Sequence, residues 1–541
     1  MVEVNLLVAA AIGTIILLFY RYVAQKYQYF LSKPVPCVKP TFLLGSNGAT
    51  IFRRRGIVSH LLKLYNAYPD SKVTGVYDFM TPVFLIRDPD VIKKICVKDF
   101  EFFVDHTPII PKEQLDRETG GQSLTRNTLF VLRGQKWRDM RATLSPAFTG
   151  SRMRHTFDLV AECARSMSNF FAAEAKSGKK LEYEMKDTFS RLCTDMIATV
   201  AFGIEIDSLK NRDNDFYRKG TQMLNVRSIK VMLKVLLLFT MPSLMEKLGV
   251  DVISSSLLAY FKGMVLDNMK QREVHGIVRN DMIHMLMEIR QGGLRHQNDE
   301  QNLKDAGFAT VEESSVGKSI HSRLWTDNEL IAQCLLFYMA GFETISTCLT
   351  FLTYELTVNR EIQDRLYEEI KNTDRSLDGK APTYEVLQRM TYMDMVVSEG
   401  LRMWPPQLVS ERYCTKDYQY DDEAGTRFVI EKGRTVAIPI IAIHRDSKYY
   451  PNPDVFDPER FSQQNRSGMG AVPYIPFSIG PRNCIGSRLA LMEVKSILYY
   501  LLKDFSLQPT EKTQIPLRLM KHLFALQSEK GVWLEVKPRE S

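Results

Sequence analysis

The chain has 541 residues, and its 45% hydrophobic and 25% charged residues are typical of a globular protein. The formal net charge of +8, from 71 basic and 63 acidic residues, is too small an excess to indicate nucleic-acid binding. The eight cysteines are scattered, with no CxxC or CxH spacing, which disfavours a zinc site and indicates a reducing compartment.

The N-terminal segment predicts a membrane anchor over residues 1–23. Leu6 to Tyr20 contains no charge, and about 20 apolar residues are enough to cross a bilayer. No basic region precedes the segment and no small-residue cleavage site follows it, which disfavours a signal peptide, and a buried core helix is the remaining alternative. Basic residues follow the segment and Glu3 precedes it, so the positive-inside rule places the body in the cytosol.

Residues 24–40 form a proline-rich linker, because the sequence KPVPCVKP favours extended backbone and so a semi-rigid spacer. We interpret residues 41–541 as a single catalytic domain, mainly α-helical with a minor β-sheet. Short β-prone runs occur at 73–79, 82–86, 428–433, 435–441 and 531–536. A polar stretch, Gln291 to Arg323, predicts a long exposed loop. The apolar segment 228–250 fits either a core helix or a segment at the bilayer surface.

Residues 326–356 predict a long helix that is buried on nearly every face. Thr326 and Glu329 have the spacing of a capping box at its start. Within it, the sequence AGFET contains Gly341, which allows close approach to the backbone, and Thr344, whose hydroxyl can bond to a carbonyl one turn earlier. Taken alone, this pattern is more typical of a core helix with one buried threonine.

Glu399 and Arg402, in the sequence SEGLRMWPP, are three residues apart and can share one face of a helix that ends at the prolines. Most such pairs are solvated ion pairs, so the spacing alone is a weak signal.

The sequence PFSIGPRNCIG at 476–486 is the strongest motif in the chain. Its fixed positions are Phe477, Gly480, Arg482, Cys484 and Gly486, which would coincide by chance only on the order of one time in ten thousand. A helical period begins directly after the cysteine, so the N–H groups of the helix start are expected to stabilise a thiolate and lower its pKa. The glycines let the backbone approach a flat group, and Phe477 can shield the sulfur from water.

At this motif the chain resembles the cytochrome P450 family of haem-thiolate monooxygenases, with which the resemblance covers roughly residues 34–536. It implies the P450 fold and haem b (iron protoporphyrin IX), with Cys484 as the metal ligand. It also implies that Glu343 and Thr344 manage protons during catalysis. The other residues that the resemblance places at the haem are Phe477, Arg482, Trp137 and Arg141 of WRDMR, Arg412 and His444, with Glu399, Arg402, Arg460, Gly480 and Gly486 as structural residues nearby.

Among subfamilies, the chain is most similar to insect detoxifying forms related to animal drug-metabolising monooxygenases. This implies NADPH- and O2-dependent insertion of one oxygen atom into apolar small molecules, with xenobiotics such as insecticides or plant toxins as the first candidates. The sequence contains no GxGxxG strand–turn–helix motif, so the electrons must come from another protein. The implied donors are NADPH–cytochrome P450 reductase and, as an optional second donor, cytochrome b5, at the cytosolic face of the endoplasmic reticulum membrane.

Three alternatives stay open. In the first, the substrate is an endogenous lipid, steroid or hormone. In the second, the enzyme is a reductase-independent haem-thiolate isomerase or dehydratase, and in the third, the protein is a non-catalytic haem protein that binds a ligand. The presence of Glu343 and Thr344 argues against the isomerase. Family precedent places substrate contacts at 105–130, 222–250, 336–344, 407–410 and 523–525. Lys136 and Arg138 are candidates for a basic face that docks an acidic electron donor.

Overall fold

The computed structural model describes residues 2–108, 124–178, 180–223, 234, 237, 244–245, 253–279, 281–291, 323–423, 425–466, 474–521 and 526–540. Over these residues the chain is mostly helical with three small sheets, which confirms the predicted fold class. The segment 228–250 and the predicted loop 291–323 lie almost entirely outside the described residues.

The helices of the first half are α1 (Val2–Lys26), α2 (Gly48–Ile51), α3 (Ile57–Tyr65), α4 (Pro89–Lys93), α6 (Gly134–Leu144), α7 (Gly150–Ala175), α8 (Met185–Phe202), α9 (Asp215–Met223), α12 (Ser255–His275) and α13 (Met282–Arg290). Those of the second half are α14 (Asp327–Val358), α15 (Arg360–Ser376), α16 (Tyr384–Arg389), α17 (Thr391–Met403), α18 (Ile440–Ile443), α19 (Gln463–Arg466) and α20 (Ser487–Asp504).

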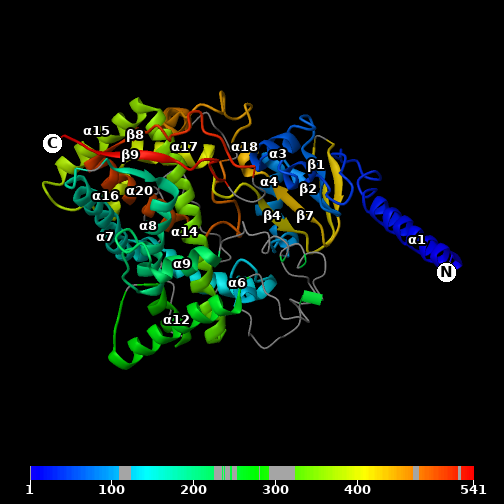
Figure 1. Cartoon of the computed structure of the whole chain (residues 1–541), viewed down its shortest axis with the longest axis horizontal. Coiled ribbons are helices and arrows are strands. Elements are labelled where there is room, and N and C mark those ends of the chain that lie inside the picture. The colour runs from blue at the N-terminus through cyan, green and yellow to red at the C-terminus, as the bar shows by residue number, and fades with distance from the viewer. Residues whose placement is uncertain are drawn as a thin grey trace.

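The largest sheet has four strands in the order β1 (Val73–Asp78), β2 (Thr81–Ile86), β7 (Thr435–Ile438) and β4 (Ser410–Tyr413). Within it β2 and β7 run parallel and the other pairs are antiparallel. A second sheet has the order β3 (Glu182–Glu184), β9 (Trp533–Pro538) and β8 (Phe505–Pro509), and β5 (Tyr418–Asp421) pairs with β6 (Arg427–Ile430). The four-stranded sheet and the helical bundle occupy opposite sides of the molecule (Figure 1).

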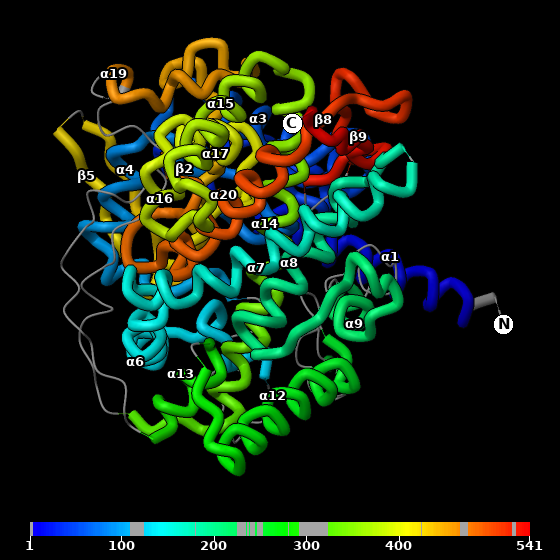
Figure 2. Tube along the Cα trace, turned by 90° about the vertical axis from the view of Figure 1, so that its left-hand side faces the viewer, coloured from blue at the N-terminus to red at the C-terminus, as the bar shows by residue number. Residues whose placement is uncertain are grey.

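Helix α14 runs through the middle of the bundle, where it packs against α8, α17 and α20 (Figure 2). The capping box predicted at its start is present: the Thr326 hydroxyl accepts from the Glu329 N–H, and the Glu329 carboxylate accepts from the Thr326 N–H. Because both ends of this exchange are satisfied, the helix has a defined first turn. Its apolar length is largely buried, as the sequence pattern predicts.

Helix α1 projects from the sheet side of the molecule with its apolar side chains exposed (Figure 1). Two described helices are long and apolar enough to cross a membrane, Val4–Lys26 and Asp327–Val358, and the second is a largely buried core helix. The helix continues to Lys26, beyond the boundary expected at residue 23. The linker does not stand free of the body: Phe30 is 3% exposed and packs on Gly75 of β1, where a Cβ would lie 2.8 Å from its ring.

Candidate active site at the start of α20

A cavity of about 340 Å³ lies between α14, α6 and the loop that leads into α20. Its wall includes seven of the predicted site residues, which come from three separate segments of the chain: Trp137, Arg141, Thr344, Phe477, Arg482, Cys484 and Gly486. Much of the remaining wall is apolar, including Phe130, Phe148, Ile197, Leu336 and Phe337. The cavity therefore combines the Cys484 thiol, two guanidinium groups and a hydrophobic surface.

The loop around Cys484 is held by its own backbone. The Cys484 N–H donates to the Phe477 carbonyl at 2.9 Å, and the Asn483 N–H donates to the Gly480 carbonyl at 2.9 Å. Gly480 has φ +77°, and a Cβ on it would lie 2.0 Å from the Cys96 carbonyl oxygen, so only glycine fits. Gly480 thus packs against backbone rather than against the cavity, whereas Gly486 lies in the cavity wall.

The Cys484 side chain is accessible from the cavity but is otherwise surrounded by protein. Burial raises the pKa of its thiol, while the Gly486 N–H and the positive charge of Arg141 act in the opposite direction. The start of α20 therefore does not by itself lower the pKa, contrary to the sequence-based expectation, because desolvation is the larger effect. A coordinated metal ion deprotonates such a thiol, so this environment fits a metal-bound thiolate.

Arg141 and Arg482 both connect the cavity wall to the backbone. Arg141 donates to the carbonyl and the side-chain oxygen of Asn483, at 2.8 and 2.7 Å. Arg482 stacks 3.9 Å above the ring of Trp137, and its nitrogens donate to the carbonyls of Val104, Leu129 and Leu132 and to Asp105. These bonds use all but one of its N–H groups, so Arg482 mainly anchors the loop and has one donor left for a ligand.

Arg412 is fully buried one side chain behind the cavity wall. Its two terminal nitrogens each donate to a serine, Ser410 and Ser478, and both serines line the cavity. The Nε–H of Arg412 has no hydrogen-bond partner among the described residues. A buried guanidinium with an unused donor fits a carboxylate supplied by a bound group, and the two propionates of haem are such groups.

Thr344 and Glu343 lie on different faces of α14. The Thr344 hydroxyl faces the cavity and donates to the Ala340 carbonyl at 2.6 Å, which is the back-bond that the sequence predicts. Glu343 does not line the cavity: its side chain is 42% exposed and its carboxylate lies 3.0 Å from Lys186 Nζ. Lys186 also donates to Ser346 and Thr347, and burial lowers its pKa although Glu343 opposes this. Sequence reasoning missed Lys186, because no local pattern relates it to α14.

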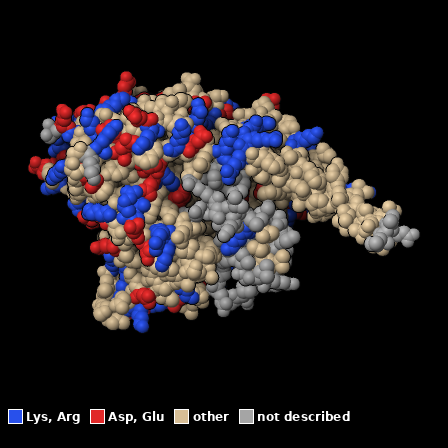
Figure 3. All heavy atoms as spheres, in the orientation of Figure 1, with Lys and Arg blue, Asp and Glu red and all other residues tan. Residues whose placement is uncertain are grey.

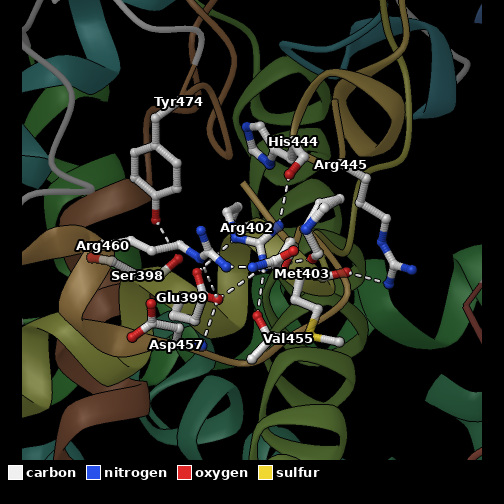
Figure 4. Close-up of polar contacts among 12 residues, drawn as sticks. Ser398, Glu399, Arg402, Met403, His444, Arg445, Val455, Asp457, Arg460 and Tyr474 are labelled. Carbon is white, nitrogen blue, oxygen red and sulfur yellow. Dashed lines mark hydrogen bonds and ion pairs between the residues drawn. The ribbon is translucent and has the colours of Figure 1, made fainter. Parts of the chain in front are cut away.

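Glu399 and Arg402 form a fully buried ion pair in which two guanidinium nitrogens donate to the carboxylate at 2.6 and 2.8 Å (Figure 4). Glu399 also accepts from the Asp457 N–H at 2.9 Å and lies 3.4 Å from Arg460 Nε. Arg402 donates to the His444 carbonyl at 2.7 Å. The structure thus joins the three residues that the resemblance grouped together.

His444 was expected to face the haem, but it does not line the cavity. Its Nε2 accepts from the Ile475 N–H at 3.0 Å, and its ring stacks on Tyr474. Burial, with the nearby Arg402 charge, lowers the pKa of His444 to about 3, so the ring is neutral and can accept this bond. His444 therefore connects the Glu399–Arg402 pair to the residues that lead into the Cys484 loop (Figure 4).

His106 is a cavity-lining residue that sequence reasoning did not single out. Its ring stacks on Phe130 with centroids 4.5 Å apart, and its Nδ1 lies 3.2 Å from the Glu411 carbonyl. Burial and the charges of Arg482 and Arg412 hold its pKa well below the usual value. A lone histidine carries no motif, so only the fold could reveal this position.

The basic residues Lys136 and Arg138, predicted as part of a docking face, both pair with acids of the same chain. Lys136 Nζ lies 2.6 Å from Glu329, and Arg138 contacts both carboxylate oxygens of Glu101 at 3.0 and 2.9 Å. These pairs reduce the charge that the two residues present to a partner.

Comparison with known proteins agrees with this geometry. The family model "Cytochrome P450" matches residues 35–534. The chain is 39% identical to cytochrome P450 9e2 of Blattella germanica over 98% of its own length and 97% of that protein. It is 34% identical to cytochrome P450 9b2 of Drosophila melanogaster (97% of each chain) and 32% identical to cytochrome P450 3A41 of Mus musculus (98% and 96%).

The chain belongs to the cytochrome P450 family. Its cofactor is accordingly haem b held by a cysteine thiolate, and it is an enzyme of the monooxygenase class. The cavity residues fit this cofactor, since the Cys484 sulfur and the guanidinium groups of Arg141 and Arg482 meet at one apolar space. Similarity to insect and mammalian P450s agrees with the subfamily that the sequence resembles.

Proposed function

We propose that this protein is a membrane-bound monooxygenase that uses NADPH and O2 to insert one oxygen atom into apolar small molecules, with xenobiotics such as insecticides or plant toxins as the main substrates. One observation carries the proposal: the Cys484 sulfur, the Thr344 hydroxyl and an apolar wall face the same cavity. The Cys484 motif occurs once in the chain, so Cys484 is the proposed iron ligand.

Cys484 would hold the haem iron, and hydrogen-bond donors of the protein would bind the haem propionates. Arg141 and Trp137 lie in the cavity wall. Within the part of the chain that the structure describes, Arg412 has an unused Nε–H and Arg482 has one remaining N–H. Phe477 shields the loop from the cavity side. When bound, the haem supplies the redox chemistry, in which O2, two electrons and two protons yield one inserted oxygen atom and one water.

Thr344 and Glu343 are proposed to deliver protons from opposite faces of α14. Glu343 is accessible to solvent beside Lys186, so it can exchange protons with bulk water. Thr344 donates its own hydroxyl hydrogen to Ala340, which leaves its oxygen lone pairs available to orient a donor inside the cavity. Apolar residues, including Phe130, Phe148 and Leu336, are proposed to bind the substrate and exclude water.

The proposed electron donors are NADPH–cytochrome P450 reductase and cytochrome b5, and the proposed location is the cytosolic face of the endoplasmic reticulum membrane. The exposed apolar helix α1 supports an anchor near the N-terminus. The division into an anchor (1–23), a linker (24–40) and one catalytic domain (41–541) remains part of this proposal.

The test begins with full-length protein purified with haem. Its reduced carbon monoxide complex should show the red-shifted band of a thiolate-ligated haem; a spectrum like that of a histidine-ligated globin would refute the proposal. A panel of insecticides, plant toxins, steroids and fatty acids is then screened by haem spin-state shift. Products should form only with NADPH, reductase and O2. Turnover of a peroxide without NADPH would instead indicate an isomerase, and binding of steroids alone would indicate an endogenous substrate.

A further inference from the structure

The net charge of the chain is concentrated near its N-terminus. Residues 4–69 contain eight Lys and Arg and no Asp or Glu, whereas the rest of the chain contains 63 basic and 63 acidic residues. The whole formal charge of +8 therefore belongs to this one segment. A charge gathered in this way indicates a partner of opposite charge. The eight residues are Arg21, Lys26, Lys33, Lys39, Arg53, Arg54, Arg55 and Lys63.

These charges are mostly not neutralised by the protein itself. Lys33 pairs with Glu431, but the other seven side chains have no ion pair within the part of the chain that the structure describes. Arg53 and Arg54 are in addition exposed to solvent. Adjacent cationic groups without a counter-charge repel one another, so a negatively charged partner from outside the chain would stabilise them.

The arginines Arg53–Arg55 follow α2 and lie on the body near the C-terminal end of α1. Tyr20 of α1 stacks on Phe42 with centroids 5.4 Å apart. The start of α2 packs back on this segment, since a Cβ on Gly48 would lie 3.1 Å from Thr41 Oγ1. Lys and Arg side chains predominate over Asp and Glu on the body beside α1 (Figure 3). The basic residues are therefore next to the proposed membrane anchor.

Exposed aromatic rings accompany these charges. Phe42 is 43% exposed and Phe52 is 63% exposed, and the Arg54 guanidinium lies 5.9 Å from the centre of the Phe52 ring. Lys and Arg interleaved with aromatic rings are typical of the membrane–water interface, where the rings lie among the headgroups. A lipid surface thus accounts for both the charges and the rings, whereas an acidic protein accounts for the charges alone. We call Lys39, Phe42, Phe52 and Arg53–Arg55 the basic aromatic surface.

The linker fixes the position of this surface relative to α1. Gly75 of β1 donates its N–H to the Pro36 carbonyl at 2.7 Å and accepts from the Val38 N–H at 2.9 Å. Lys33 pairs with Glu431, directly after β6. Because the linker is bonded to two sheets of the body, the body cannot turn freely about the end of α1. A bilayer that contains α1 would therefore lie beside the basic aromatic surface.

Membrane topology alone does not account for Arg53–Arg55. The positive-inside rule counts charges within about 15–20 residues of the end of a membrane span. Arg21, Lys26 and Lys39 satisfy this condition at the end of α1, but Arg53–Arg55 lie beyond it and belong to the folded body. Their position therefore requires a role other than orienting the anchor during insertion.

We propose that the basic aromatic surface binds the headgroups of anionic phospholipids and holds the catalytic body on an anionic bilayer. The inference rests on the membrane location that is part of the proposed function. A guanidinium group suits a lipid phosphate or carboxylate because two of its N–H groups can donate to two oxygens at once. Phe42 and Phe52 enter the interface beside the headgroups. Since the attraction is electrostatic, it weakens as salt is added.

The first test uses the full-length holoenzyme in phosphatidylcholine bilayers with or without phosphatidylserine. Phenylglyoxal modifies accessible arginine side chains, and mass spectrometry identifies the modified residues. Phosphatidylserine should protect Arg53 and Arg54, and high salt should remove the protection. Arg389 of α16 is the internal control, because it is exposed and α16 lies on the far side of the molecule from α1 (Figure 1). Equal reactivity of Arg53 and Arg54 in both bilayers would overturn the inference.

The second test asks which lipid accumulates beside the body. Energy transfer to the haem is measured from dansyl-labelled phosphatidylserine and from dansyl-labelled phosphatidylcholine in vesicles that contain the full chain. Wild type should quench the labelled phosphatidylserine more strongly. Each arginine near the surface contributes about fivefold to the association constant, so Arg53→Gln combined with Arg54→Gln should weaken the preference by about 25-fold. Both residues are exposed, so the carbon monoxide band should not change.

Arg375→Gln combined with Arg389→Gln is the matched control. It removes the same charge from exposed positions on α15 and α16, and neither arginine has an ion pair among the described residues. The control should keep the preference for phosphatidylserine. If both double variants lose it equally, the effect is one of overall charge and the inference fails.

Two further outcomes separate this inference from the proposed function. If the reductase protects Arg53 and Arg54 from phenylglyoxal and phosphatidylserine does not, the surface docks an acidic protein and the inference fails. Product formation with NADPH and reductase is measured in the same bilayers. Its absence, with the lipid preference retained, would refute the proposed monooxygenase and support the lipid site.

Discussion

At the scale of single residues, two neighbouring positions on α14 differ in what they face. Thr344 contacts the cavity and Glu343 contacts Lys186 and solvent. Successive helical residues are rotated by about 100°, so a pair of adjacent side chains can join the outside of the bundle to its interior. The structure therefore separates the acid that is exposed to solvent from the alcohol that faces the cavity.

We predict that Thr344→Ala keeps its haem and its carbon monoxide band but diverts electrons to peroxide, because the cavity loses the hydroxyl that orients a proton donor. Peroxide and product are measured per NADPH consumed. Thr350→Ala is the control, since Thr350 makes the same 2.6 Å back-bond, to Ser346, but does not line the cavity. Equal coupling in the two variants would contradict the assignment.

A second residue-scale prediction concerns pH and stability. The pKa of Glu493 is about 8 in the folded protein against an ordinary value of 4.5, so folding disfavours its ionised form. The contribution of its protonated form is complete below pH 4.5 and is lost as the pH rises to about 8. The Tm of Glu493→Gln should therefore rise relative to wild type between pH 5 and pH 8, as measured by thermal unfolding. A difference that does not change with pH would contradict the raised pKa.

At the scale of elements, the Cys484 loop is positioned by packing from both sides. Gly480 lies against the backbone of the π-helical turn Lys94–Lys98, and the Glu399–Arg402 pair of α17 reaches the loop through His444 and Ile475. Neither contact touches the cavity. Their effect is to hold the loop so that the sulfur points into it.

Gly480→Ala should prevent formation of the loop, because the added Cβ would lie 2.0 Å from the Cys96 carbonyl oxygen. We expect a large loss of haem content and of the carbon monoxide band. Gly379→Ala is the control: Gly379 has a similar φ of +78° but has no atom within 4 Å of the added Cβ. It should cost only about 1 kcal/mol of backbone strain. Normal haem content in Gly480→Ala would show that the loop can move.

Removing Arg402 should be more damaging than removing Arg460. Arg402→Ala leaves the fully buried Glu399 carboxylate without its two-bond partner, which costs about 3–5 kcal/mol in unfolding free energy. Arg460 lies 3.4 Å from the same carboxylate and is partly exposed, so Arg460→Ala should cost about 1 kcal/mol or less. Denaturant unfolding of both variants measures the difference. Equal losses would indicate that the pair is not the main support.

At the scale of the whole molecule, the apolar helix α1 lies outside the body that contains the cavity. Charged residues cover much of the helical body, while α1 presents mainly uncharged side chains (Figure 3). Near its C-terminal end α1 meets the body, where Val23 is fully buried and Tyr20 stacks on Phe42 with centroids 5.4 Å apart.

Deletion of residues 2–20 should therefore release the protein from the membrane while leaving the site intact. Val23 and the packed linker remain, so the carbon monoxide band should be unchanged. Membrane fractionation in high salt measures the first effect, and the spectrum measures the second. If the truncated protein still sediments with membranes, the body itself binds lipid. A lost band would mean that α1 supports the fold.

Much of the site could be predicted from sequence because its signals are local. The spacing around Cys484, the capping box at Thr326 and the periodicity of α14 are set by backbone geometry within a few residues. The linker was only partly predictable, since its prolines indicate extended backbone but not that Phe30 packs on β1.

Sequence alone determined the family, the cysteine loop and the membrane-anchor candidate, because each depends on residues adjacent in the chain. Tertiary structure alone decided that His444 supports the loop instead of facing the cavity and that Glu343 pairs with Lys186. It also decided that the Glu493 carboxylate has no hydrogen-bond partner among the described residues. The physical reason is that burial and pairing depend on which distant segments pack together. Burial and pairing in turn decide whether a titratable group carries a charge.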